Sequence, residues 1–182
     1  TADDFRENVF GGSNTDHRNY IFKKELPAAK IAVYAAEKEL IYRYLYRDNV
    51  QPLPGLKDLL HDLKASGVPM AIATSAERAN VDFILAETGI QEFFTAIADA
   101  SMVSRGKPDP EVFLKAASML DAAPADCLVF EDTLKGIDAA LHAKMKVIGV
   151  ATTHHKAELT EAHKVISDFT EIDVNTIREL FK

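Results

Sequence analysis

Short apolar runs alternate with helical patterns along most of this chain. The runs are mostly four to six residues long, and stretches with apolar residues at helical spacing separate them. The strands that we expect are 68–73, 95–98, 127–130, 146–150 and 165–166. Strands that are apolar on both sides must be covered on both faces. The sequence therefore predicts a parallel sheet between layers of helices, an α/β fold of the Rossmann-like type.

The first 50 residues carry no strand pattern and are expected to be helical, with a clear helical period over 28–47. The Pro- and Gly-rich segment 51–55 then interrupts the chain. It predicts a boundary between a helical domain over 1–50 and an α/β domain over 51–182. The later helices are expected to begin at Leu56 and end near Gly67, to include 81–85 and stop at Gly89, and to cover 110–120, 133–143 and 174–181.

Composition narrows the class of protein. A chain of 182 residues that is 47% hydrophobic can bury a core. Its net charge of -7, without a dense Lys/Arg run, argues against a nucleic-acid partner. It has no apolar stretch near the roughly 18 residues that span a bilayer, so no membrane partner is expected. The single Cys127 and the absence of a signal-peptide pattern predict a cytoplasmic protein. A monomer is favoured, although the sequence does not fix the oligomeric state.

Three polar clusters follow apolar runs, where ligands bind in open parallel sheets. Thr74-Ser75 follows the strand expected at 68–73. Its hydroxyl and the next backbone N–H groups can bind a phosphate, because helix N-termini favour anions. Thr74-Ser-Ala-Glu77 also matches a capping box, in which the same hydroxyl only starts a helix. That second interpretation is the favoured one for this cluster taken alone.

Lys107 is the second cluster, in the segment 106–111 (Gly-Lys-Pro-Asp-Pro-Glu). A rigid Pro-Asp-Pro turn beside the lysine is expected to fix the direction of its side chain. The ammonium can then neutralise a phosphoryl oxygen and a carboxylate. The alternative is an ordinary solvated lysine. Asp109 is expected to cap the next helix.

Glu131-Asp132 is the third cluster, directly after Leu-Val-Phe. Two adjacent carboxylates at a strand end repel each other and are costly to desolvate without a cation. Mg2+ prefers one or two carboxylates plus substrate oxygens and water, so the pair predicts a magnesium site. The alternative is that Asp132 or Thr133 caps the following helix.

In their order and spacing, the motifs 73–75, 106–111 and 130–137 resemble those of the haloacid dehalogenase-like superfamily. The branch with a helical cap domain, which includes the beta-phosphoglucomutase-like phosphatases, is the most similar. The resemblance implies that Thr74, with the Ser75 backbone, binds the transferring phosphoryl group, and that Lys107 bridges phosphate and nucleophile. It implies that Glu131 and Asp132 hold Mg2+.

The resemblance also assigns roles in the cap, whose loop 11–14 (Gly-Gly-Ser-Asn) matches the family's substrate-specificity loop. Asn14 and Lys38 are implied to face the substrate. Beta-phosphoglucomutases carry an Arg in that loop where Asn14 stands here, with Arg18 nearby, and this favours a phosphatase over a mutase.

The family's nucleophile is the first Asp of an Asp-x-Asp on a central strand before the cap, and this sequence contains no Asp-x-Asp. We therefore expect that roughly 40 residues, a strand and a helix of typical length, precede this chain, and that these residues alone are inactive.

The predicted function is Mg2+-dependent hydrolysis of a small phosphorylated metabolite, in the class of sugar phosphates, through an aspartyl-phosphate on the missing Asp. The alternatives are a beta-phosphoglucomutase and a non-catalytic relative that binds a phosphorylated ligand or a partner. A phospho-accepting receiver domain also uses an acidic pair, a Thr and a Lys, but there the acids come first, whereas here they come last.

Overall fold

The computed structural model describes residues 27–182 and contains two groups of parallel strands. Strands β1 (Ala71–Ala73) and β2 (Ala96–Ala98) pair in register Ile72↔Ile97. Strands β3 (Leu128–Glu131), β4 (Lys146–Val150) and β5 (Lys164–Ile166) form a second sheet in that order, with Phe130 beside Ile148. The predicted α/β fold with parallel strands is confirmed, although β1 begins three residues later than the apolar run suggests.

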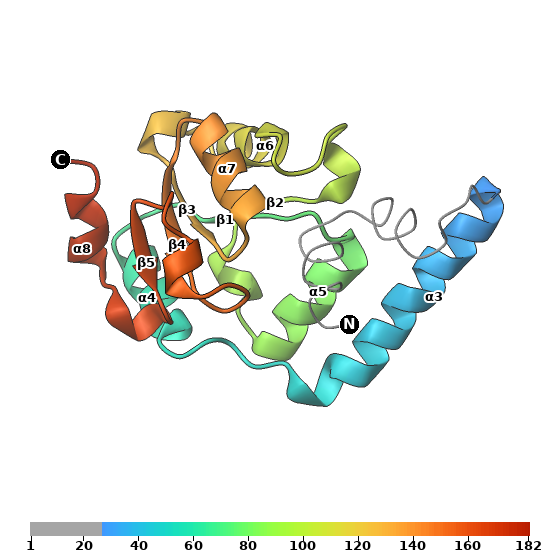
Figure 1. Cartoon of the computed structure of the whole chain (residues 1–182). Coiled ribbons are helices and arrows are strands. Elements are labelled where there is room, and N and C mark those ends of the chain that lie inside the picture. The colour runs from blue at the N-terminus through green and yellow to red at the C-terminus, as the bar shows by residue number, and fades with distance from the viewer. Residues whose placement is uncertain (1–26) are drawn as a thin grey trace.

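The helices occupy the predicted places between the strands (Figure 1). They are α3 (Ala28–Tyr46), α4 (Leu56–Ala65), α5 (Arg78–Thr88), α6 (Glu111–Met119), α7 (Leu134–His142) and α8 (Val174–Glu179). Several stop where the sequence indicates: α5 ends at Gly89, whose φ of 66° is the left-handed conformation that commonly terminates a helix.

Alternating strand residues pack on opposite helical layers. On one face, α6 and α7 cover Ala71, Ala73, Val129 and Val147. On the other face, α4 and α5 cover Met70 and Ile72, while α4 and α8 cover Leu128, Phe130, Ile148 and Val150. This is the pattern expected of strands whose successive side chains point to opposite sides. Figure 1 shows α6 and α7 on one side of the strands and α4 and α5 on the other.

A gap separates the two groups of strands. In residues 27–182, β1 pairs only with β2, and β3 only with β4, so each presents an unpaired edge. An apolar cavity of about 630 Å³ lies between these edges and is lined by residues 68–73 of the β1 segment and 126–130 of the β3 segment. Leucines of α4 and residues of α6 close it from the two helical layers. We refer to this cavity and its two strand edges as the β1–β3 gap.

The segment 51–55 joins α3 to the α/β part of the molecule. Gly55 has φ 75°, and a side chain on it would lie 2.6 Å from the backbone carbonyl carbon of Phe169. The Phe169 N–H donates to the Pro54 carbonyl at 3.0 Å, which ties this segment to the far end of the chain. The proposed domain boundary near residue 50 stays a prediction, because the structure describes only the last part of the helical region.

The apolar side chains of α3 do not form its buried face. Val33, Leu40, Tyr44 and Leu45 are exposed, while Glu39 is 7% exposed. No helix in the part of the chain from residue 27 onward combines the length and apolar character needed to cross a membrane.

Candidate active site

The three polar clusters lie at one edge of the strands. The loop that follows β2 carries Lys107, whose ammonium contacts Glu131 at the carboxyl end of β3. The Ala100 N–H, just after β2, donates to the Ala76 carbonyl in the loop that follows β1. The carboxyl ends of β1, β2 and β3 therefore meet, and Thr74 and Glu131 lie on the two sides of the β1–β3 gap.

Lys107 and Glu131 form a buried ion pair. Lys107 Nζ lies 2.7 Å from Glu131 Oε2, and the two side chains are 10% and 8% exposed. The same ammonium lies 4.7 Å from the centre of the Phe113 ring, which adds a cation–π contact. The Lys107 side chain is therefore held in one position and shielded from solvent, which favours the first of the two interpretations of this lysine over an ordinary solvated one.

The surroundings of Glu131 keep it ionised. Burial alone would raise the pKa of its carboxyl, but the positive charge of Lys107 and hydrogen bonds from Lys107 and Thr133 outweigh burial, so the pKa is lowered. Thr133 donates to Glu131 Oε1 from its N–H at 3.1 Å and from its hydroxyl at 2.7 Å. Both carboxylate oxygens therefore have partners, and Glu131 acts here as the anchor of Lys107.

Gly136 makes room for this carboxylate. A Cβ atom at Gly136 would lie 2.0 Å from Glu131 Cδ, so no larger residue fits without a shift. The Gly136 N–H donates to Thr133 Oγ1 at 3.1 Å, and Thr133 is the N-cap of α7. The predicted capping role thus belongs to Thr133, and Asp132 remains available for another role.

Asp132 points to the loop after β4, where its Oδ2 accepts hydrogen bonds from the hydroxyls of Thr153 and, at 3.4 Å, Thr152. Within residues 27–182, no group of three or more His, Cys, Asp or Glu side chains is placed to hold a metal ion. A Mg2+ ion needs only one or two carboxylates when phosphate oxygens and water complete its shell. Asp132 is suited to be such a metal ligand, whereas both Glu131 oxygens already accept hydrogen bonds from Lys107 and Thr133.

Thr74 does not cap a helix. The α5 helix begins at Arg78 with Glu77 at its N-cap, so the capping-box prediction is wrong. Instead, Thr74 Oγ1 accepts from the Ala76 N–H at 3.1 Å, which leaves the hydroxyl proton free to donate to an anion. The Thr74 N–H donates to the Ala98 carbonyl at 2.9 Å, whereas the Ser75 N–H has no hydrogen-bond acceptor among the residues that the structure describes.

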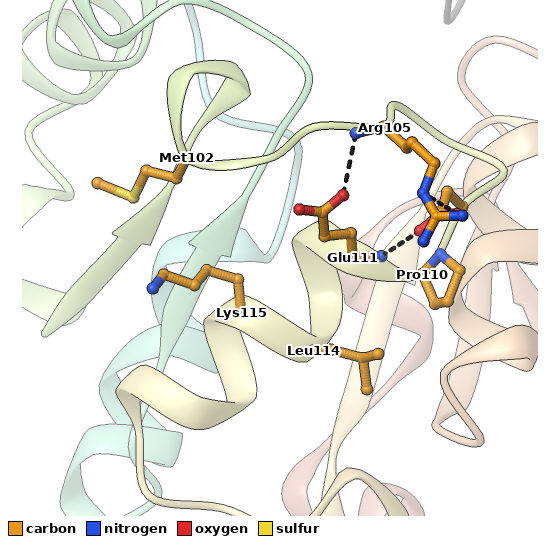
Figure 2. A pocket seen from close by; sticks show the side chains of 7 residues that line it. Met102, Arg105, Pro110, Glu111, Leu114 and Lys115 are labelled. Atoms are coloured by element: carbon orange, nitrogen blue, oxygen red, sulfur yellow. Dashed lines mark hydrogen bonds and ion pairs between the residues drawn. The ribbon is translucent and has the colours of Figure 1, made fainter.

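The loop that presents Lys107 is braced by its own side chains (Figure 2). Glu111 accepts from the N–H groups of Ser104 and Arg105, both at 2.9 Å, and Arg105 pairs with Asp109 at 3.0 Å. The Glu111 N–H in turn donates to Asp109 Oδ1 at 3.0 Å. The N-cap of α6 is Pro110, so the prediction that Asp109 caps this helix is wrong by one residue, although the Asp109 carboxylate accepts from the first N–H of the helix. These contacts hold the Lys107 loop in a defined position.

Two residues of the helical region, Lys38 and Asn14, were predicted to face the substrate. Lys38 lies on α3, where its ammonium is 2.7 Å from Glu39 Oε1. Asn14 lies outside the described residues. Local sequence reasoning missed Phe113 and Thr153, which contact the charged groups from distant positions. A glycine inside the helical pattern of α7 was the available signal for Gly136, because glycine is unfavourable there unless something approaches closely.

The chain is similar to a large family of known proteins. The family model of the haloacid dehalogenase-like hydrolases matches residues 2–144. The chain belongs to this family. Its haloacid dehalogenase-like motifs are those quoted above, and the predicted resemblance is confirmed.

Two curated relatives and one solved structure show the branch. The bifunctional riboflavin kinase/FMN phosphatase of Arabidopsis thaliana is 40% identical over 127 residues, 69% of this chain and 34% of that protein. The beta-phosphoglucomutase of Bacillus subtilis (strain 168) is 37% identical over 142 residues, 78% of this chain and 59% of that protein. The structure of beta-phosphoglucomutase from Clostridium difficile superposes with a TM-score of 0.88 at 27% identity, covering 100% of this chain and 82% of that one. This haloacid dehalogenase-like chain thus spans less than two thirds of the length of both curated relatives.

Proposed function

We propose that this protein is a Mg2+-dependent phosphatase of a small phosphorylated metabolite, in the class of sugar phosphates. The observation that carries the proposal is the buried Lys107–Glu131 pair on one side of the β1–β3 gap, with the Thr74 hydroxyl on the other side. A fixed cation and free hydrogen-bond donors around one space suit an anion whose charge spreads during transfer.

Each residue has a role in the proposed reaction. The Thr74 hydroxyl and the Ser75 N–H donate to phosphoryl oxygens, and Lys107 neutralises both these oxygens and the attacking carboxylate. Glu131 holds the Lys107 ammonium in place. Asp132 would hold Mg2+, which when bound neutralises phosphate oxygens and orients the group for in-line attack. Lys38 and Asn14 are proposed to bind the remainder of the substrate.

The attacking carboxylate is proposed to be an Asp on a further strand in the β1–β3 gap. The two unpaired edges and the apolar cavity between them fit an apolar strand, since such an edge leaves backbone groups without partners. The carboxyl end of that strand would bring the Asp between Thr74 and Lys107. As its oxygen bonds to phosphorus, the ester P–O bond breaks, and the leaving oxygen takes a proton from the second Asp of the expected Asp-x-Asp. Water then attacks the phosphorus of the aspartyl-phosphate, which releases inorganic phosphate, frees the first Asp and returns a proton to the second.

The similarity to beta-phosphoglucomutase makes a mutase the second candidate. The two activities differ in what accepts the phosphoryl group, because a mutase returns it to a sugar and a phosphatase gives it to water. Phosphate release without any acceptor sugar distinguishes them.

The test is a phosphate-release assay on the protein produced from its whole reading frame, with Mg2+ and a panel of sugar phosphates. Asp132→Ala is expected to abolish release, and the matched control Asp138→Ala, an exposed carboxylate on α7, is expected to retain it. A folded protein that binds these esters without turnover would overturn the proposal in favour of the non-catalytic alternative. Release that survives Asp132→Ala would overturn the metal assignment.

A further inference from the structure

A buried polar network joins α3 to α5. Asn80 Nδ2 donates to Glu39 Oε2 at 2.6 Å, and Asn80 Oδ1 accepts from Arg43 Nη1 at 2.6 Å. Glu39 and Asn80 are 7% and 9% exposed. Glu39 and Arg43 lie one helical turn apart, so both reach the same partner. We refer to Glu39, Arg43 and Asn80 as the α3–α5 latch.

The latch stands out because it occupies the buried side of α3. A buried carboxylate is costly unless it is paired and hydrogen-bonded. The large apolar side chains of the same helix face outward, and the ring contact that α3 makes with α5, Tyr42 to Phe83, spans 6.5 Å between centroids. The position of α3 against α5 is therefore fixed by hydrogen bonds between polar side chains more than by apolar packing.

A carboxamide is the side chain that satisfies both partners at once. Glu39 accepts only and needs a donor, whereas Arg43 donates only and needs an acceptor. The amide group of Asn80 supplies one of each. An Asp at this position would repel Glu39, and an Ala would remove the donor that Asn80 supplies to Glu39 Oε2.

The latch reaches two parts of the proposed site. Asn80 lies in the first turn of α5, directly after the loop that carries Thr74 and Ser75. Glu39 holds Asn80 through Oε2 and Lys38 through Oε1, 2.7 Å from the lysine ammonium. One carboxylate thus links the proposed substrate-binding lysine to the helix behind the phosphate-binding loop.

We propose that Asn80 is a positioning residue which, through Glu39, fixes Lys38 relative to the Thr74 loop. The latch then sets the distance at which a substrate can present its phosphate to Thr74 and a second anionic or polar group to Lys38. Asn80 itself touches no substrate. This inference rests on the proposed function for its consequence, but the latch can be tested without it.

The first test is amide hydrogen exchange on the protein produced from its whole reading frame. Asn80→Ala is expected to raise exchange in α3 and in residues 74–80 by about tenfold, because local opening is no longer opposed by the latch. Exchange in the central strand β4 is expected to stay unchanged. The control Glu87→Ala removes an exposed carboxylate from the same helix and is expected to change neither region. Unchanged exchange in α3, or an equal rise in β4, would overturn the latch.

The second test separates positioning from stability by substrate. For a sugar phosphate that carries a second phosphate, Asn80→Ala is expected to raise KM about tenfold with little change in kcat. For p-nitrophenyl phosphate, which has no group for Lys38, the KM of Asn80→Ala is expected to equal that of the parent protein. For the substrate with a second phosphate, Asn80→Gln is expected to raise KM less than Asn80→Ala does. Equal effects on both substrates would contradict positioning of Lys38. Absence of turnover with every ester would refute the proposed function, and hydrogen exchange would still decide the latch.

Discussion

Lys107 Nζ and Glu131 Oε2 lie 2.7 Å apart in the interior, although 24 residues separate them along the chain. The pair links the loop after β2 to the carboxyl end of β3. Because both charges are nearly buried, each depends on the other, and this dependence gives the first prediction.

Lys107→Met leaves the Glu131 carboxylate buried without its cation. Loss of one partner of a buried pair is expected to lower the free energy of unfolding by about 3 kcal/mol. The double variant Lys107→Met/Glu131→Gln removes both charges and is expected to lose less than the sum of the single variants. Urea unfolding of the four proteins measures this coupling. Additive losses would show that the two groups do not interact in the folded protein.

Gly136→Ala tests the close approach of α7 to Glu131. In an ordinary helix interior this change stabilises by up to about 1 kcal/mol. Here the new methyl group would lie 2.0 Å from Glu131 Cδ, so we expect a loss of about 2 kcal/mol from overpacking. Gly106→Ala is the control, because nothing lies within 4 Å of its Cβ position. Thermal unfolding that shows Gly136→Ala to be stabilising would contradict the contact.

Gly55→Ala and Gly67→Ala separate backbone strain from collision. Both glycines have positive φ, 75° and 70°, so each substitution is expected to cost about 1 kcal/mol from strain. Only Gly55 faces the backbone of Phe169 and Thr170, at 2.6 Å, and we expect its loss to exceed that of Gly67→Ala by about 2 kcal/mol. Chemical denaturation of the pair measures the difference. Equal losses would argue against the tight contact between residues 55 and 169.

Glu171 predicts a pH dependence of the stability of the fold. Hydrogen bonds from Lys156 and Ser167 lower the pKa of this carboxyl to about 2. A carboxyl with a lowered pKa stabilises the fold above its ordinary pKa, and the contribution is lost as pH falls through the lowered value. Glu171→Gln is therefore expected to destabilise at pH 7 and to match the parent protein near pH 2. Unfolding curves at both pH values check this, with the exposed Glu161→Gln as control. A difference that persists at the lower pH would contradict the assignment.

The sequence predicted the order of helices and strands well, because short apolar runs and helical periods are local signals. It failed at Thr74, where the capping-box pattern is local but the backbone is held by a distant partner, the Ala100 N–H on the Ala76 carbonyl. It also could not show that Glu39, within an apolar helical pattern, would be buried while Leu40 and Leu45 face outward. That arrangement depends on Asn80, 41 residues away.

The sequence motifs predicted which residues gather at this edge of the strands, but not which of them contact one another. Lys107 and Asp132 lie where the motifs indicated, at one edge of the strands. The engagement of both Glu131 oxygens, one by Lys107 and the other by Thr133, depends on the folded geometry and therefore could not be predicted from the motif alone.

We propose that these residues hold a phosphoryl group whose nucleophile stands on a further strand. The most direct test measures Mg2+-dependent phosphate release from beta-glucose 1-phosphate by two proteins in parallel, the 182-residue chain alone and the protein produced from its whole reading frame. We expect the protein from the whole reading frame to release phosphate and the 182-residue chain alone to release none. Release by the 182 residues alone, abolished by Asp132→Ala, would show that the nucleophile lies within this chain and not on a further strand.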